Sequence, residues 1–154
     1  WGRELRSVAH ASDSPLLVNR RIDVAQIVDA DGVHLPDLGL PIAEIRTHWP
    51  TMEMLGVSRH DSVGLATAER DSATFAFLSP VFSVPGKGKP IGIHGLRTAI
   101  AAVGIPTYAL GGIQPEDVKA ILATGTAGIA VQRGIYAASD PKEALHRYID
   151  ALNL

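Results

Sequence analysis

Short apolar runs alternate with longer amphipathic segments along the whole chain, and this alternation limits the folds that it can adopt. The runs are rich in β-branched, leucine and aromatic side chains, and few polar residues interrupt them. Such continuous runs are typical of strands in a parallel sheet that helices cover. We therefore predict six buried strands, at residues 16–18, 32–35, 54–57, 75–78, 107–110 and 128–131.

The segments between these runs have their apolar residues at helical spacing. One of them opens with Gln114 and Pro115, and proline suits the first turn of a helix. A strand followed by a helix thus recurs six times, which predicts one α/β domain over residues 1–154. The predicted helices cover residues 3–10, 21–28, 40–48, 61–70, 93–103, 115–123 and 140–152.

The ends of the last two predicted strands favour a (β/α)₈ (TIM) barrel over an open doubly-wound sheet, which is the alternative. Gly111 and Gly112 follow one strand, and Gln132, Arg133 and Gly134 follow the next. In TIM barrels the loops after strands seven and eight bind phosphate, and glycine lets backbone N–H donors approach an anion. Counting back, the first run becomes strand three. We expect strands one and two to be absent from this chain, leaving open edges that need covering.

Composition excludes several classes of function. The formal net charge is -2 and the basic residues are scattered, so we expect no nucleic-acid partner. No apolar run is long enough to span a membrane, and we expect no membrane partner and a cytoplasmic location. The chain has 0 cysteines, which excludes thiol chemistry.

Short motifs in order along nearly the whole chain carry a family resemblance. They occupy residues 17–23, 30–35, 56–60, 79–82, 85–87, 108–113 and 127–131. Together they resemble the thiamin phosphate synthase family, which includes the TenI-type thiazole tautomerases. The resemblance implies a barrel, usually dimeric, in thiamin biosynthesis. Its synthases join an aminopyrimidine diphosphate to a thiazole phosphate and release diphosphate, assisted by Mg²⁺.

The metal ligands that the resemblance implies are replaced in this chain. The synthases have an aspartate after the asparagine that corresponds to Asn19, and Arg20 stands there. Gly39 occupies the place of the second carboxylate, and Asp37 lies out of register as a weak candidate. One carboxylate beside an arginine is a poor site for a hard cation. We predict no tight magnesium site.

Other positions match residues that contact substrate in the family. Lys87 keeps the place of the diphosphate-binding lysine, in a loop with Gly86. Ser58 matches a ligand position after its strand. His34 and His60 lie near the ends of adjacent predicted strands and could transfer protons near neutral pH. The predicted substrate and phosphate contacts are Asn19, Gly86, Gly111, Gly112, Gln132 and Arg133.

Three functions remain open on this reading. The first is a thiamin phosphate synthase-like transferase with a degraded magnesium site. The second is a metal-free isomerase of a thiazole phosphate that uses His34 or His60, since Pro80 fills the place of the tautomerase histidine. The third is a non-catalytic protein that binds a phosphorylated ligand. No pairing of a nucleophile with a base is evident from the spacing, so we do not expect a hydrolase.

Overall fold

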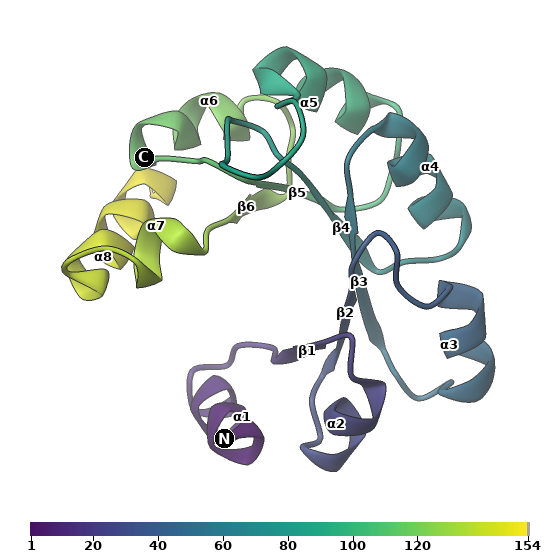
Figure 1. The fold of residues 1–154 in the computed structure, drawn as a ribbon. Helices are drawn as coiled ribbons and strands as arrows, with labels where there is room; N and C mark the ends of the chain where they lie inside the picture. The colour runs from purple at the N-terminus through teal and green to yellow at the C-terminus, as the bar shows by residue number, and fades with distance from the viewer. Residues whose placement is uncertain (154) are drawn as a thin grey trace.

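Six parallel strands form one curved sheet, and their order in the sheet follows the sequence. The computed structural model describes residues 1–153. Figure 1 shows the strands as an arc with helices along its outer side. The strands are β1 (Leu17–Asn19), β2 (Gly32–Leu35), β3 (Met54–Arg59), β4 (Phe75–Leu78), β5 (Thr107–Leu110) and β6 (Gly128–Ala130).

Helices precede, connect and follow the strands. In the connection from β5 to β6 a 3-10 turn precedes the α-helix, and Pro115 and the capping pair of Gln114 and Asp117 start this turn. The helices are α1 (Gly2–Ala11), α2 (Ile22–Ile27), α3 (Ile42–His48), α4 (Ser62–Arg70), α5 (Gly92–Ala101), η1 (Pro115–Asp117), α6 (Val118–Leu122), α7 (Arg133–Tyr136) and α8 (Pro141–Leu152).

The strand order decides between the two predicted architectures. A doubly-wound sheet reverses direction at a switch point, whereas this sheet runs from β1 to β6 without reversal. The doubly-wound alternative is therefore wrong, and the described residues form a parallel half-barrel. Its two edge strands, β1 and β6, each pair with one neighbour and lie on either side of the opening in Figure 1.

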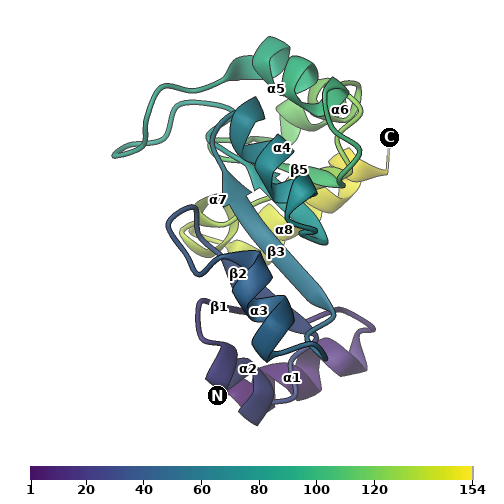
Figure 2. The same cartoon turned by 90° about the vertical axis from the view of Figure 1, so that its right-hand side faces the viewer.

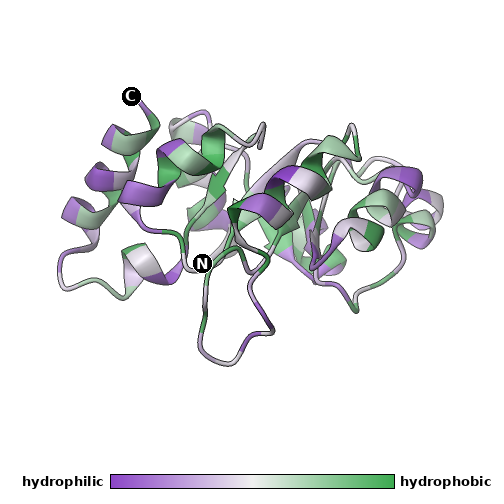
Figure 3. Ribbon diagram, turned by 90° about the horizontal axis from the view of Figure 1, so that it is seen from above, coloured by the Kyte–Doolittle hydropathy of each residue, from purple (hydrophilic) through white to green (hydrophobic). Residues whose placement is uncertain are grey.

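The main core lies between the sheet and the helices on its convex side. Alternate residues of each central strand are fully buried there, as the two-residue period of a strand requires. Leu55 and Val57 of β3 are examples, and Leu65 of α4 and Leu96 of α5 belong to the same core cluster. Figure 3 shows hydrophobic residues along the strands, while the helices carry both hydrophobic and hydrophilic residues.

The concave face of the sheet carries an aromatic cluster. The ring of Phe77 lies 5.3 Å from Phe75, 6.0 Å from Tyr108 and 5.5 Å from His34, measured between centroids. These residues alternate with the core residues of their strands, so they point to the inside of the arc. The opening of the half-barrel thus borders a partly apolar surface.

The predicted elements agree with the structure except at a few boundaries. The strand predicted at 54–57 extends to Arg59, and the helix predicted at 115–123 is divided into η1 and α6. The short helix α7 was not predicted, because a four-residue helix shows no periodicity. It places Arg133 in a helical turn directly after β6.

The connection between β4 and α5 projects away from the rest of the molecule, as Figure 2 shows. It contains the exposed residues Gly86, Lys87, Gly88 and Lys89. Within residues 1–153, no helix has the length and apolar character that crossing a membrane requires.

Candidate functional site

A cavity of about 410 Å³ lies at the carboxyl ends of the strands. This volume falls in the range of small-molecule sites, which is about 300–1,000 Å³. All six strands point the same way, so the loops that follow β2 to β6 meet at this end of the sheet. Eight residues that we had singled out line it: Asp37, Ser58, His60, Lys87, Gly111, Gly112, Gln132 and Arg133.

The glycine loop after β5 is shaped by close contact with the loop after β4. Gly111 and Gly112 have φ angles of 102° and 69°, a region that favours glycine. A Cβ atom on Gly112 would lie 2.9 Å from the Ser83 carbonyl oxygen, and one on Gly111 would lie 2.9 Å from the Pro80 Cα. The Phe82 N–H also donates to the Gly111 carbonyl at 3.0 Å. Side chains are excluded here, which brings backbone close to any ligand in the cavity.

The charged residues of the cavity lining are mainly cationic. Lys87 comes from the projecting loop and Arg133 from α7, so the cations approach from separate elements. The lining includes one carboxylate, Asp37, and its oxygen lies 3.8 Å from a guanidinium nitrogen of Arg59. Partial neutralisation of Asp37 leaves a positive potential in the cavity. Such a site suits an anion.

A hydrogen-bonded chain crosses three adjacent strand ends. His34 Nδ1 lies 2.9 Å from Asn19 Oδ1, and His34 Nε2 lies 2.9 Å from Ser58 Oγ. The register pairs Asn19 with His34 across β1 and β2, and Ser58 lies two residues beyond Gly56, the β3 partner of His34. If the Asn19 oxygen accepts from Nδ1–H, Nε2 is left to accept the Ser58 hydroxyl. Burial lowers the pKa of His34, which favours the neutral ring that this arrangement needs.

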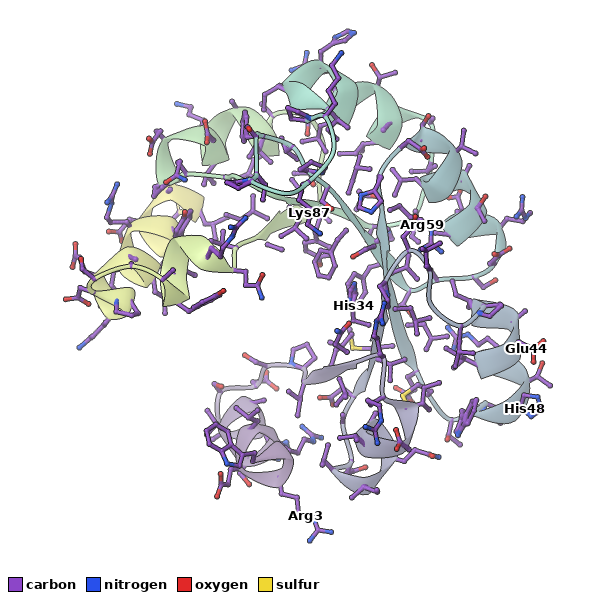
Figure 4. The ribbon with its side chains drawn as sticks, in the orientation of Figure 1. Arg3, His34, Glu44, His48, Arg59 and Lys87 are labelled. Carbon is purple, nitrogen blue, oxygen red and sulfur yellow. The ribbon has the colours of Figure 1, made fainter. Side chains whose placement is uncertain are left out.

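This chain of contacts is one that the spacing along the sequence did not show. A serine, a histidine and an orienting amide are in hydrogen-bond contact. Ser58 lines the cavity, and His34 reaches the cavity through Ser58. Figure 4 shows His34 toward the concave side of the sheet. The arrangement can hold or move a proton at Ser58 Oγ.

His60 occupies a different part of the same end of the sheet. It lines the cavity, and its Nδ1 lies 2.6 Å from the Ser79 carbonyl oxygen. A carbonyl can only accept, so Nδ1 carries the proton in this contact and Nε2 is left as the acceptor in the neutral ring. Both predicted histidines therefore belong to the site, one directly and one through Ser58.

The residues present do not fit a magnesium ion. Among residues 1–153, no group of three or more histidine, aspartate or glutamate side chains could hold a metal. Asp37 is paired with Arg59, and Arg20 is exposed beside Asn19. Gly39 contributes no side chain and packs against the Pro36 carbonyl. Hard cations require several oxygen ligands.

Two predicted contacts lie away from the cavity lining. Asn19 acts on His34, and Gly86 lies in the projecting loop next to Lys87. Sequence reasoning also missed contributors to the site. Arg59 donates to the Ser58 carbonyl at 2.7 Å and holds Asp37, and its position at the end of β3 is the signal that could have found it. Gln114 and Ser83, after the neighbouring strands, also line the cavity.

Comparison with known proteins identifies relatives. The family model described as thiamine monophosphate synthase (TMP-TENI) matches residues 1–135. A thiamine-phosphate synthase of Chloroflexus aurantiacus is 39% identical over 140 residues, which is 89% of this chain and 64% of the relative. One of Archaeoglobus fulgidus is 38% identical over 152 residues, 97% of this chain and 71% of the relative. The chain thus spans about two thirds of these relatives.

A solved structure agrees with the sequence relatives. Thiamine phosphate pyrophosphorylase from Pyrococcus furiosus superimposes with a TM-score of 0.91 at 32% identity. The match covers 99% of this chain and 74% of the Pyrococcus chain. The half-barrel therefore corresponds to most of a homologous fold.

Proposed function

Because the chain belongs to the thiamine monophosphate synthase family, we propose that it acts in thiamin biosynthesis on phosphorylated thiazole and pyrimidine compounds. The reaction that we propose is a synthase-type transfer. The bond between the pyrimidine methylene carbon and a diphosphate oxygen breaks, a bond from that carbon to the thiazole nitrogen forms, and diphosphate leaves.

The observation that carries this proposal is the cationic cavity beside two glycine-containing loops. Phosphate groups are bound by backbone N–H groups and by lysine and arginine side chains. We assign the thiazole phosphate to the loops at Gly111, Gly112 and Gly134, with Arg133 as a cation. Lys87 is assigned to the diphosphate, and neutralising charge on a leaving group lowers the barrier to its departure.

No step of this proposal is assigned to a metal ion. The magnesium that the family resemblance implies lacks fitting ligands among the described residues, since Arg20 and Gly39 stand at the expected positions. Neutralisation of negative charge is therefore assigned to Lys87 at the diphosphate and to Arg133 at the thiazole phosphate. Ser58, held by His34, is assigned to form a hydrogen bond with the substrate in the cavity, either as donor or as acceptor.

We also propose that the functional fold is a closed (β/α)₈ barrel. Two open edges, β1 and β6, flank the gap, and the homologous Pyrococcus chain extends beyond the matched part. Two further strands between these edges would pair both of them and cover the aromatic cluster on the concave face. Three further statements stay predictions: that residues 1–154 form one domain, that the protein is a dimer, and that it is located in the cytoplasm.

A second candidate function is isomerisation of a thiazole phosphate without metal. The contact of His34 with Ser58 favours it, because a neutral histidine can take the Ser58 proton while Ser58 takes one from the substrate. A third candidate is a non-catalytic binder. In that case Arg133 would fill the phosphate site rather than grip a ligand there.

Binding of a thiazole phosphate tests the phosphate site. We expect Lys87→Ala and Arg133→Ala each to weaken it by about 10- to 150-fold, because a charge-assisted hydrogen bond contributes about 1.5–3 kcal/mol. Lys142→Ala is the matched control, since Lys142 is an exposed lysine on α8 and outside the cavity lining. Calorimetric titration measures the three affinities. Unchanged affinity in both cavity variants contradicts the assignment.

Product analysis then separates the three functions. Formation of a coupled product from both precursors supports the transferase. Isomerisation of a thiazole carboxylate phosphate, lost in His34→Ala or His60→Ala, supports the isomerase. Binding without turnover of either substrate leaves the non-catalytic protein.

A further inference from the structure

A buried tyrosine of α8 contacts the backs of both proposed phosphate loops. Tyr148 is 4% exposed, and its hydroxyl donates to the Ile113 carbonyl oxygen at 2.9 Å. A Cβ atom on Gly134 would lie 2.5 Å from the same hydroxyl oxygen. One side chain therefore touches the loop after β5 and the turn after β6.

Both contacted residues belong to the wall of the cavity. Ile113 follows Gly111 and Gly112 directly, and Gly134 follows Arg133. All five residues line the cavity, whereas Tyr148 does not. Tyr148 thus stands behind the wall and can act on a ligand only through the residues that form it.

The peptide after Ile113 is held at both of its polar groups. Its carbonyl accepts from Tyr148, and its N–H, that of Gln114, donates to the Asp117 carboxylate at 2.9 Å. On its other side, the loop is held where the Phe82 N–H donates to the Gly111 carbonyl. A backbone segment fixed at two ends has little freedom to rotate its amides.

We propose that Tyr148 is a positioning residue for the phosphate site, which sets the spacing between the loop after β5 and the turn after β6 so that both can bind one phosphate. This inference rests on the phosphate site of the proposed function. Preorganised donors bind an anion more tightly, because no ordering is required when the ligand arrives.

The protonation state of Tyr148 agrees with this role. A tyrosine hydroxyl is protonated at neutral pH, and burial, with a further contribution from Glu116, raises the pKa of Tyr148 still further. Tyr148 belongs to α8, which packs against η1, α6 and α7. Through this side chain α8 contacts both loops.

Titration with inorganic phosphate, followed by the NMR signals of the backbone amides, tests the proposal. We expect the amides of Gly111, Gly112 and Gly134 to shift in the unmodified protein. In Tyr148→Phe, which keeps the ring, we expect affinity to fall about fivefold, since a neutral hydrogen bond contributes about 1 kcal/mol. Tyr136→Phe is the matched control, because Tyr136 is 63% exposed on α7 and we expect no change in affinity.

A double-mutant cycle tests the contact with Gly134. Gly134→Ala places a Cβ against the Tyr148 hydroxyl, so phosphate affinity should fall. Adding Tyr148→Phe removes that oxygen, and the combined loss should be smaller than the product of the two single losses. A purely structural tyrosine would lower thermal stability and leave the affinity of the folded protein unchanged.

The outcomes separate the two proposals. Phosphate-induced shifts of equal affinity in the unmodified protein and in Tyr148→Phe overturn the positioning role and leave the phosphate site standing. Absence of shifts at Gly111, Gly112 and Gly134 in the unmodified protein overturns both. A selective loss in Tyr148→Phe, with Tyr136→Phe unchanged, supports the positioning role.

Discussion

Replacing Gly112 by alanine should destabilise the fold more than the same replacement at Gly125. Both glycines have positive φ angles, 69° and 91°. A new Cβ on Gly112 would lie 2.9 Å from both the Phe82 Cβ and the Ser83 carbonyl oxygen, whereas a Cβ on Gly125 would meet nothing within 4 Å. Comparing Gly112→Ala with Gly125→Ala therefore separates the cost of backbone strain, which both share, from the cost of the steric contact between two loops, which only Gly112→Ala has.

The magnitude follows from these two contributions. Alanine in the left-handed region costs about 1–2 kcal/mol, reduced by about 0.4–1 kcal/mol because alanine restricts the unfolded chain. Gly125→Ala should thus cost about 0–1.6 kcal/mol. Gly112→Ala adds overpacking against backbone atoms that cannot rotate away, which costs about 1–3 kcal/mol more.

Urea unfolding of both variants measures the difference. With about 2–4 °C per kcal/mol for a chain of this size, thermal unfolding should separate the two midpoints clearly. The affinity of Gly112→Ala for inorganic phosphate should fall as well, while that of Gly125→Ala should not. Equal losses of stability in the two variants would refute the reasoning, because the steric contact between the loops would then add nothing to the cost of Gly112→Ala.

Other substitutions test the core, the half-buried His34 and the ion pair of Asp37 with Arg59. Leu55→Ala should cost about 2–5 kcal/mol by urea unfolding, and Leu38→Ala almost nothing, since the residues are 0% and 93% exposed. The pKa of His34 lies below 6.5, so its contribution to stability is present above that pH and lost as pH falls. His34→Gln should flatten the pH dependence of stability below pH 6.5, and an unchanged slope there would contradict this. Asp37→Asn should cost less than about 1 kcal/mol. Arg59→Met should cost more than Asp37→Asn, because Arg59 also donates to a backbone carbonyl of β3 at 2.7 Å, and equal costs would contradict that role.

The order and type of the main elements could be predicted because their signals are local. Continuous apolar runs marked the six strands, and helical spacing marked the segments between them. The glycine pair after β5 pointed to the loop at Gly111 and Gly112 for the same reason, since the need for a positive φ depends on a few neighbouring residues. Parallel strands then brought the predicted residues to one end of the sheet.

Contacts between distant residues could not be predicted in this way. The chain from Asn19 through His34 to Ser58 depends on the register of three strands, which packing against the helices determines. The pairing of Asp37 with Arg59 depends on the path of a loop.

The sequence by itself thus determined the succession of strands and helices, the family and the glycine loops, because these depend on local periodicity and residue type. Only the tertiary structure decided that the sheet curves in sequential order and that Tyr148 reaches Ile113 from 35 residues away. Such contacts arise when the chain packs as a whole, since no local pattern specifies which distant group will satisfy a buried carbonyl.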